Sequence, residues 1–201
     1  QVFPEYAPVT IRQPMNEDGT AGEEMPPGEV GEICVHGPIV FLGYYNNPAA
    51  TAAAISKEGI LYTGDMGYFH DFGSYMGLKF AGRRKFVIKP KGFLVFPDEV
   101  TDYISRHPKV AQAQVLGMPH EVFVDGVFAY VQPKPGVELT PGEILEYCKN
   151  MAAYKRPIHV ELWPVDEPLP ATRVGKVNVP ALIELAEKVV ARLRSEGKWD
   201  K

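Results

Sequence analysis

Three charged side chains each follow a glycine, at positions where the backbone can turn and a side chain can reach a ligand. Asp65 ends the segment Tyr-Thr-Gly-Asp, and its two carboxylate oxygens could accept hydrogen bonds from both hydroxyls of a ribose diol. The guanidinium of Arg83 could contact ribose and phosphate together. Lys176 lies in a polar loop between two prolines, where its ammonium could relieve the repulsion between a carboxylate and a phosphate. These residue types indicate chemistry on a nucleotide.

Each of the three residues also has a simpler interpretation. Asp65 could cap its own backbone in an Asx-turn. Arg83 and Lys176 could be solvated surface residues, as most arginines and lysines are. Taken one at a time, the residues leave both interpretations open. Their positions within longer motifs favour ligand binding.

Four short motifs follow one another along the chain, and together they are much more specific than any one alone. The first is glycine-spaced and ends in Gly-Tyr-Tyr-Asn-Asn-Pro, and the second contains Thr-Gly-Asp. The third starts with Gly-Arg-Arg-Lys, and the fourth ends in Gly-Lys. They occupy residues 31–48, 62–65, 82–99 and 170–176. In this order they resemble the late signature motifs of the adenylate-forming enzymes, a superfamily that includes acyl-CoA ligases, luciferases and peptide-synthetase adenylation domains.

The resemblance implies a role for each residue that matches the signature. It places Tyr62, Thr63, Asp65 and Arg83 at the nucleotide. It makes Lys176 the catalytic residue, whose ammonium approaches the α-phosphate of ATP as the carboxylate attacks. The chain has no metal-ligand spacing of its own, so the ligand of the Mg²⁺ that accompanies ATP is expected outside this sequence.

A hinge and part of a CoA site are also implied by the third motif. Lys85 matches the position about which such enzymes turn their small domain. The next residue departs from the family pattern, because Phe86 stands where acidic or small polar residues are usual. Lys91, Gly92 and Phe93 resemble the loop that lines the pantetheine tunnel of CoA. A plain hairpin turn is an equally good interpretation of this loop.

The function implied is an ATP-dependent, AMP-forming carboxylate–CoA ligase, which places the chain in acyl-CoA metabolism, including that of fatty acids. Its partners would be a small-molecule carboxylate, CoA and an amino-terminal domain of the same protein that carries the triphosphate loop. Without that domain, the fragment is expected to be inactive. Pro97 favours the CoA ligases over peptide-synthetase adenylation domains, which usually lack this proline. Another alternative is a non-catalytic nucleotide- or CoA-binding or interaction module that kept the fold.

The elements that must position these residues change character near Arg83. Residues 1–83 are rich in Gly and Pro with short alternating apolar segments, which predicts a small, mostly β subdomain at the end of a large amino-terminal domain. Residues 84–201 mix strand and helix patterns, which predicts a mobile α+β carboxyl-terminal lid domain. Helices are expected near residues 48–55, 97–106, 140–152 and 180–193, the third starting at a capping box. The overall fold class is therefore α+β.

Composition and charge exclude several other classes of protein. The chain has 201 residues, of which 45% are hydrophobic and 23% charged, and no apolar run is long enough to span a membrane. Its five histidines have no metal-ligand spacing, and its basic residues are too dispersed for a nucleic-acid surface. The two cysteines, Cys34 and Cys148, each lie in an apolar run and are expected to be buried thiols in the cytoplasm.

Overall fold

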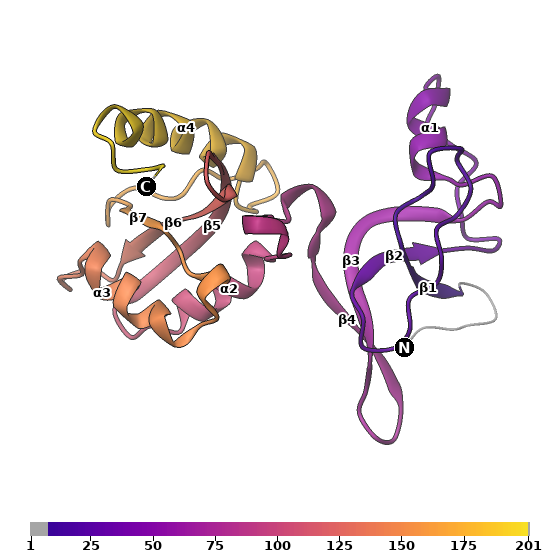
Figure 1. Ribbon diagram of the computed structural model, residues 1–201, viewed down its shortest axis with the longest axis horizontal. Coiled ribbons are helices and arrows are strands. Elements are labelled where there is room, and N and C mark those ends of the chain that lie inside the picture. The colour runs from indigo at the N-terminus through magenta and orange to yellow at the C-terminus, as the bar shows by residue number, and fades with distance from the viewer. Residues whose placement is uncertain (1–7, 201) are drawn as a thin grey trace. The chain divides into compact units, whose positions relative to one another are not determined.

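The computed structural model describes residues 8–200, which form two compact units divided between Lys85 and Phe86 (Figure 1). The first unit is built on a four-stranded sheet in the order β1-β2-β3-β4, and every neighbouring pair is antiparallel. Its strands are β1 (Val9–Arg12), β2 (Gly31–Val35), β3 (Leu61–Asp71) and β4 (Met76–Arg83). The short helix α1 (Pro48–Ala54) is capped by the Asn47 side chain.

The second unit is an α+β structure around a three-stranded sheet in the order β5-β6-β7. The strands are β5 (Val110–His120), β6 (Val124–Pro133) and β7 (His159–Leu162), with β5 antiparallel and β7 parallel to β6. The helices are α2 (Pro97–Ser105), α3 (Pro141–Tyr147) and α4 (Val179–Ser195). The predicted α+β class is confirmed.

Two hydrophobic clusters lie on opposite faces of this second sheet. One joins β5, β6 and β7 to buried residues of α2 and α3, including Val100, Ile104 and Ile144. The other joins the opposite sheet face to α4, where Leu182 and Ala186 are fully buried. Figure 1 shows the same layers, with α4 on one side of the sheet and α2 and α3 on the other. Both sheet faces are thus covered, which stabilises the unit by apolar burial.

Local sequence signals account for several element boundaries. Thr140 and Glu143 form the expected reciprocal capping box at the start of α3. A hairpin of two strands was expected around residues 86–95, but the structure has two short 3₁₀ turns, Arg84–Phe86 and Pro90–Gly92. A single bridge between Ile88 and Val95 closes this loop. Both residues are completely buried, so their side chains contribute to the hydrophobic core, although the segment forms only this one bridge.

The two cysteines are buried, as expected from their apolar surroundings. Burial raises the pKa of the Cys34 thiol to about 12, and the nearby Glu32 carboxylate adds to that rise. Burial alone raises the pKa of the Cys148 thiol to about 11. Both groups are therefore neutral thiols near pH 7 and take part in packing.

Candidate functional site

Asp65 and Arg83 face each other across β3 and β4. They are paired in the strand register, and the Arg83 Nε lies 2.8 Å from the Asp65 Oδ1. This contact is an ion pair, and Oδ1 has no hydrogen-bond partner among the described residues. The Asp65 side chain is 29% exposed and that of Arg83 is 54% exposed. A carboxylate and a guanidinium thus stand together at an accessible strand end.

The irregular part of β3 that carries Asp65 is fixed by its own neighbours. Gly64 has a φ of 76°, a conformation that glycine adopts without strain. The Thr63 hydroxyl donates to the Ile33 carbonyl at 2.7 Å and accepts from the Asp65 N–H at 3.1 Å. Thr63 therefore orients Asp65 by linking its backbone to that of Ile33 in the neighbouring strand β2.

Tyr62 has a different location from the one expected of a ligand-binding residue. Its side chain is only 5% exposed and packs in the core with Cys34 and Ile60. Its hydroxyl accepts a hydrogen bond from the Gly22 N–H at 2.8 Å. The Tyr62 side chain therefore links β3 to the loop between β1 and β2, which contains Gly22.

Glu32 is a residue of this site that sequence reasoning missed. Its carboxylate is 1% exposed, with Oε1 accepting from the Gly64 N–H at 2.8 Å and Oε2 accepting from Arg84 at 2.9 Å. One buried charge thus binds both the Thr-Gly-Asp turn and the residue that follows Arg83. The sequence signal that could have identified Glu32 was an acidic residue within the apolar strand β2. A carboxylate that is buried there requires hydrogen-bond or charged partners, which indicates a structural or functional role.

Lys85 lies in the 3₁₀ turn Arg84–Phe86, at the end of the first compact unit. Lys85 is exposed to solvent. The predicted hinge position therefore coincides with the point where the two units divide.

Lys176 closes a tight loop in the second unit. The Thr172 N–H donates to the Lys176 carbonyl at 2.6 Å, and the Lys176 N–H donates to the Thr172 hydroxyl at 3.2 Å. Gly175 has a φ of 77°, which permits the turn, and a bridge between Ala171 and Val177 joins its two ends. Lys176 is exposed, so its ammonium can reach solvent from a loop that these hydrogen bonds close.

A cavity of about 500 Å³ adjoins the predicted CoA segment of the second unit. Lys91 and Phe93 line it, whereas Gly92 supplies the turn between them with a φ of 84°. Phe93 stacks on Tyr154, with ring centroids 4.6 Å apart and planes inclined by 15°. The other lining residues are Pro90, Phe123, Asp125, Gly126, Val127, Ala153, Arg156 and Ile158. Apolar rings with a few charged groups are typical of a site for an organic ligand with anionic groups.

Most of these cavity residues were not identified from the sequence, among them Phe123, Tyr154 and Arg156. Phe123 comes from the β5–β6 turn, and Tyr154 and Arg156 come from the segment before β7. The ammonium of Lys91 lies 4.7 Å from the centroid of the Phe123 ring, a cation–π arrangement. Because the three segments are distant in sequence, no local pattern reveals that they meet.

Val124 lies in strained backbone at the rim of this cavity, with a φ of 72° and 66% of its side chain exposed. We predict that Val124→Asn raises the thermal midpoint, because asparagine tolerates this conformation and the strain costs about 1–3 kcal/mol. Thermal unfolding followed by circular dichroism measures the change. Val122→Asn is the control, since Val122 is also exposed and has no positive φ. An equal or lower midpoint for Val124→Asn than for the wild type would contradict the strain.

The described residues include no cluster of three or more His, Cys, Asp or Glu side chains that could hold a metal ion. Among residues 8–200, no helix is long and apolar enough to cross a membrane.

Comparisons with known proteins agree with this geometry. Residues 99–176 match the family model of the AMP-binding enzyme C-terminal domain. YdaB of Bacillus subtilis (strain 168), whose name assigns it to the acyl-CoA ligases, is 38% identical over 167 residues, or 83% of this chain and 32% of its own length. The oxalate–CoA ligase of Arabidopsis thaliana is 34% identical over 178 residues, or 86% of this chain and 33% of its own length.

A solved structure gives the same result for the fold. ATP-bound MatB from Rhodopseudomonas palustris matches with a TM-score of 0.80 and 29% identity, over 92% of this chain and 35% of that one. The fold is thus that of an AMP-binding C-terminal domain together with the segment before it. The chain belongs to the adenylate-forming enzymes, and its relatives include proteins named as CoA ligases and as luciferin 4-monooxygenases. It spans about a third of the length of the curated relatives it matches.

Proposed function

We propose that this chain forms part of an ATP-dependent, AMP-forming carboxylate–CoA ligase. The observation that carries the proposal is the cavity beside Lys91 and Phe93, since it adds a site suited to CoA to a chain that already has the adenylate-forming signature. Its stacked rings suit the apolar pantetheine arm or the adenine, and Lys91 and Arg156 suit the phosphates. Relatives named as CoA ligases support the same assignment.

In the first half-reaction, Asp65 would accept hydrogen bonds from the ribose hydroxyls, with Arg83 beside it to contact ribose and phosphate. A carboxylate oxygen attacks the α-phosphorus of ATP, the bond to the bridging oxygen breaks, and pyrophosphate leaves. The Lys176 ammonium would stabilise the negative charge that these two anions bring together. Thr63 and Tyr62 would serve by fixing the turn and the strand that carry Asp65.

In the second half-reaction, CoA would enter along the cavity of the second unit. The thiol loses its proton, the sulfur attacks the acyl carbonyl carbon, and AMP leaves with its electron pair. We propose that the second unit turns about Lys85 between the two steps, at the division between the compact units. Lys91, Gly92 and Phe93 would then line the path of the pantetheine arm.

Other parts of the reaction must come from groups beyond these residues. Mg²⁺ would accompany the ATP phosphates, and its protein ligand would belong to an amino-terminal domain of the same protein, since the described residues provide no metal cluster. That domain would also bind the carboxylate, so this chain alone should not turn over. A fatty acid is one class of carboxylate to test. ATP and CoA as substrates, with two unpaired cysteines, suit a cytoplasmic protein.

Thioester formation by the complete ligase tests the proposal against its two alternatives. A set of carboxylates is screened for pyrophosphate release with ATP, and the products are then offered either free CoA or a phosphopantetheine carrier protein. We expect release with at least one acid and transfer to free CoA. Transfer only to the carrier would indicate a peptide-synthetase domain, and nucleotide or CoA binding without any release would indicate a non-catalytic module.

A further inference from the structure

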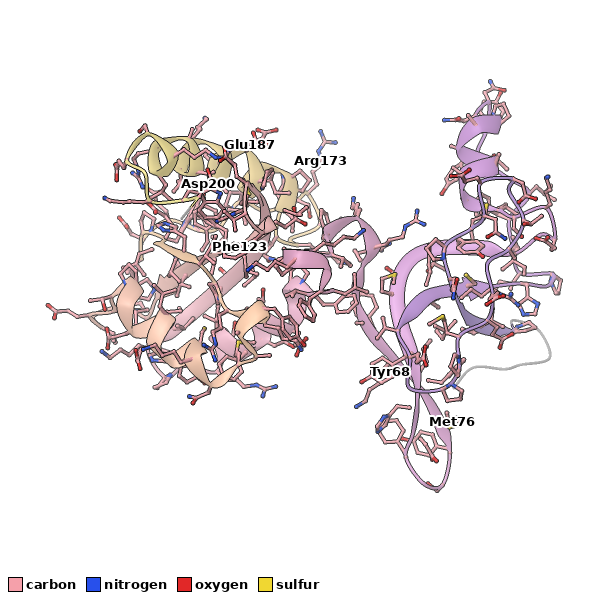
Figure 2. The ribbon with its side chains drawn as sticks, viewed as in Figure 1. Tyr68, Met76, Phe123, Arg173, Glu187 and Asp200 are labelled. Atoms are coloured by element: carbon pink, nitrogen blue, oxygen red, sulfur yellow. The ribbon has the colours of Figure 1, made fainter. Side chains whose placement is uncertain are left out.

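The last residues of the second unit bind the turn between β5 and β6. Trp199 is 3% exposed, and its indole N–H donates to the Pro119 carbonyl at 2.8 Å. The Asp200 Oδ1 accepts from the Glu121 N–H at 3.0 Å, and its Oδ2 pairs with Arg194 at 2.8 Å. We call Trp199 and Asp200 the C-terminal clasp. Figure 2 labels Asp200 beside α4 and Phe123 on the turn that the clasp binds.

His120 connects the clasp to Phe123. Its side chain is completely buried, and its Nδ1 accepts from the N–H groups of Val122 at 3.1 Å and Phe123 at 3.2 Å. The His120 ring centroid lies 5.7 Å from that of Trp199 and 4.4 Å from that of Phe123. The same Nδ1 lies 3.9 Å from the Asp200 Oδ1. Three rings thus run from the C-terminal clasp to the cavity.

Trp199 also supports the cavity floor directly. A Cβ added at Gly126 would lie 2.9 Å from the Trp199 ring and 2.5 Å from the Ile158 side chain, so both side chains press against the β6 backbone there. Gly126 and Ile158 line the cavity. The indole therefore packs against the Gly126 backbone, which lines the cavity.

Phe123 is held from the cavity side as well. Its carbonyl accepts from the Lys91 N–H at 2.7 Å, and its ring lies under the Lys91 ammonium. Both backbone polar groups of Phe123 are used, one by His120 and one by the predicted CoA loop. Phe123 is therefore held between His120 on one side and Lys91 on the other.

We infer that Trp199 and Asp200 are positioning residues for the cavity, acting through His120 and the β5–β6 turn to fix Phe123 for its ligand. The inference rests on the proposed function for the identity of that ligand as CoA. Neither clasp residue lines the cavity, so their effect on binding must pass through the turn or, for Trp199, also through the β6 backbone at Gly126.

The test measures CoA affinity of the 201-residue chain by titration calorimetry, with amide hydrogen exchange on the same proteins. We expect Asp200→Ala and Trp199→Phe each to weaken CoA binding by about fivefold or more, the equivalent of one good hydrogen bond. Exchange should become faster at Glu121, Val122 and Phe123. The matched control is Glu187→Ala, which removes the same charge from an exposed position on α4 (Figure 2) and should change neither measurement.

A second background separates positioning from general loss of structure. In Phe123→Ala, adding Asp200→Ala should have little further effect on CoA affinity, because the ring it positions is gone. Asp200→Asn keeps an oxygen that can accept from Glu121 and should restore most of the affinity. A wild-type chain that binds CoA while the clasp variants bind it equally well would overturn this inference alone. A wild-type chain that does not bind CoA would overturn the proposed CoA site and this inference together.

Discussion

Replacing Lys176 by alanine in the complete ligase should lower carboxylate-dependent pyrophosphate exchange by roughly two to three orders of magnitude, the usual cost of losing one preorganised charge contact in a transition state. The reason is that the ammonium would stabilise the charge that develops when a carboxylate approaches the α-phosphate. Thioester formation from preformed acyl-adenylate should be nearly unchanged, because no phosphoryl transfer remains in that step. Both rates are measured on the same enzyme preparation, with labelled pyrophosphate and with CoA.

The neighbouring Arg173 provides a matched control for this prediction. It lies in the same exposed loop, and Figure 2 shows its side chain extending away from the ribbon. Arg173→Ala removes one positive charge from the loop without removing the ammonium of Lys176, so exchange should fall far less. Equal losses for the two variants would mean that the general charge of the loop matters and that Lys176 has no special role. Wild-type exchange in Lys176→Ala would show that the assignment is wrong.

Replacing Glu32 by glutamine should lower the free energy of unfolding of the first unit by about 1–2 kcal/mol, the range for a charge-assisted hydrogen bond whose partner is half exposed. Glutamine can still accept from the Gly64 N–H but loses the ion pair with Arg84. Glu32→Ala should cost about 3 kcal/mol or more, because it also leaves the Gly64 N–H without its acceptor and opens a cavity. Urea unfolding followed by circular dichroism gives both values.

The site of the change can be checked within the same experiment. Both tryptophans, Trp163 and Trp199, belong to the second unit, so their fluorescence should report an unchanged transition there. Glu29→Gln is the control for the first unit, since Glu29 is an exposed acid close to β2. A loss below about 0.5 kcal/mol in Glu32→Gln, the range of ordinary surface substitutions, would contradict the structural role of the buried carboxylate.

Parts of this structure follow from local sequence chemistry. The capping box at Thr140 and the apolar stripe of α4 are short-range signals, because side chains three or four residues apart meet on a helix. The secondary structure around Ile88 was harder to predict from the sequence. Its apolar residues suit a strand, but in the structure Ile88 is buried as part of a loop between two short turns. Periodicity cannot distinguish these arrangements over so few residues.

The site was less predictable than the fold. The motifs identified Asp65 and Arg83 as candidates, but their pairing depends on the β3–β4 register, which shifts between Met66 and Gly67. Tyr62 belongs to the same motif, yet strand alternation directs its side chain into the core. The cavity residues Phe123 and Tyr154 come from separate segments, and only tertiary packing brings them together.

We propose that one chain carries a nucleotide-binding segment around Asp65 in its first unit and a CoA cavity in its second. Nuclear magnetic resonance titration of the isotopically labelled 201-residue chain with AMP, and separately with CoA, tests it most directly. We predict that AMP shifts the amide signals of Gly64, Asp65 and Arg83, whereas CoA shifts those of Lys91, Phe93, Phe123 and Tyr154. Shifts by either ligand confined to other residues, or none at millimolar concentration, would contradict the claim.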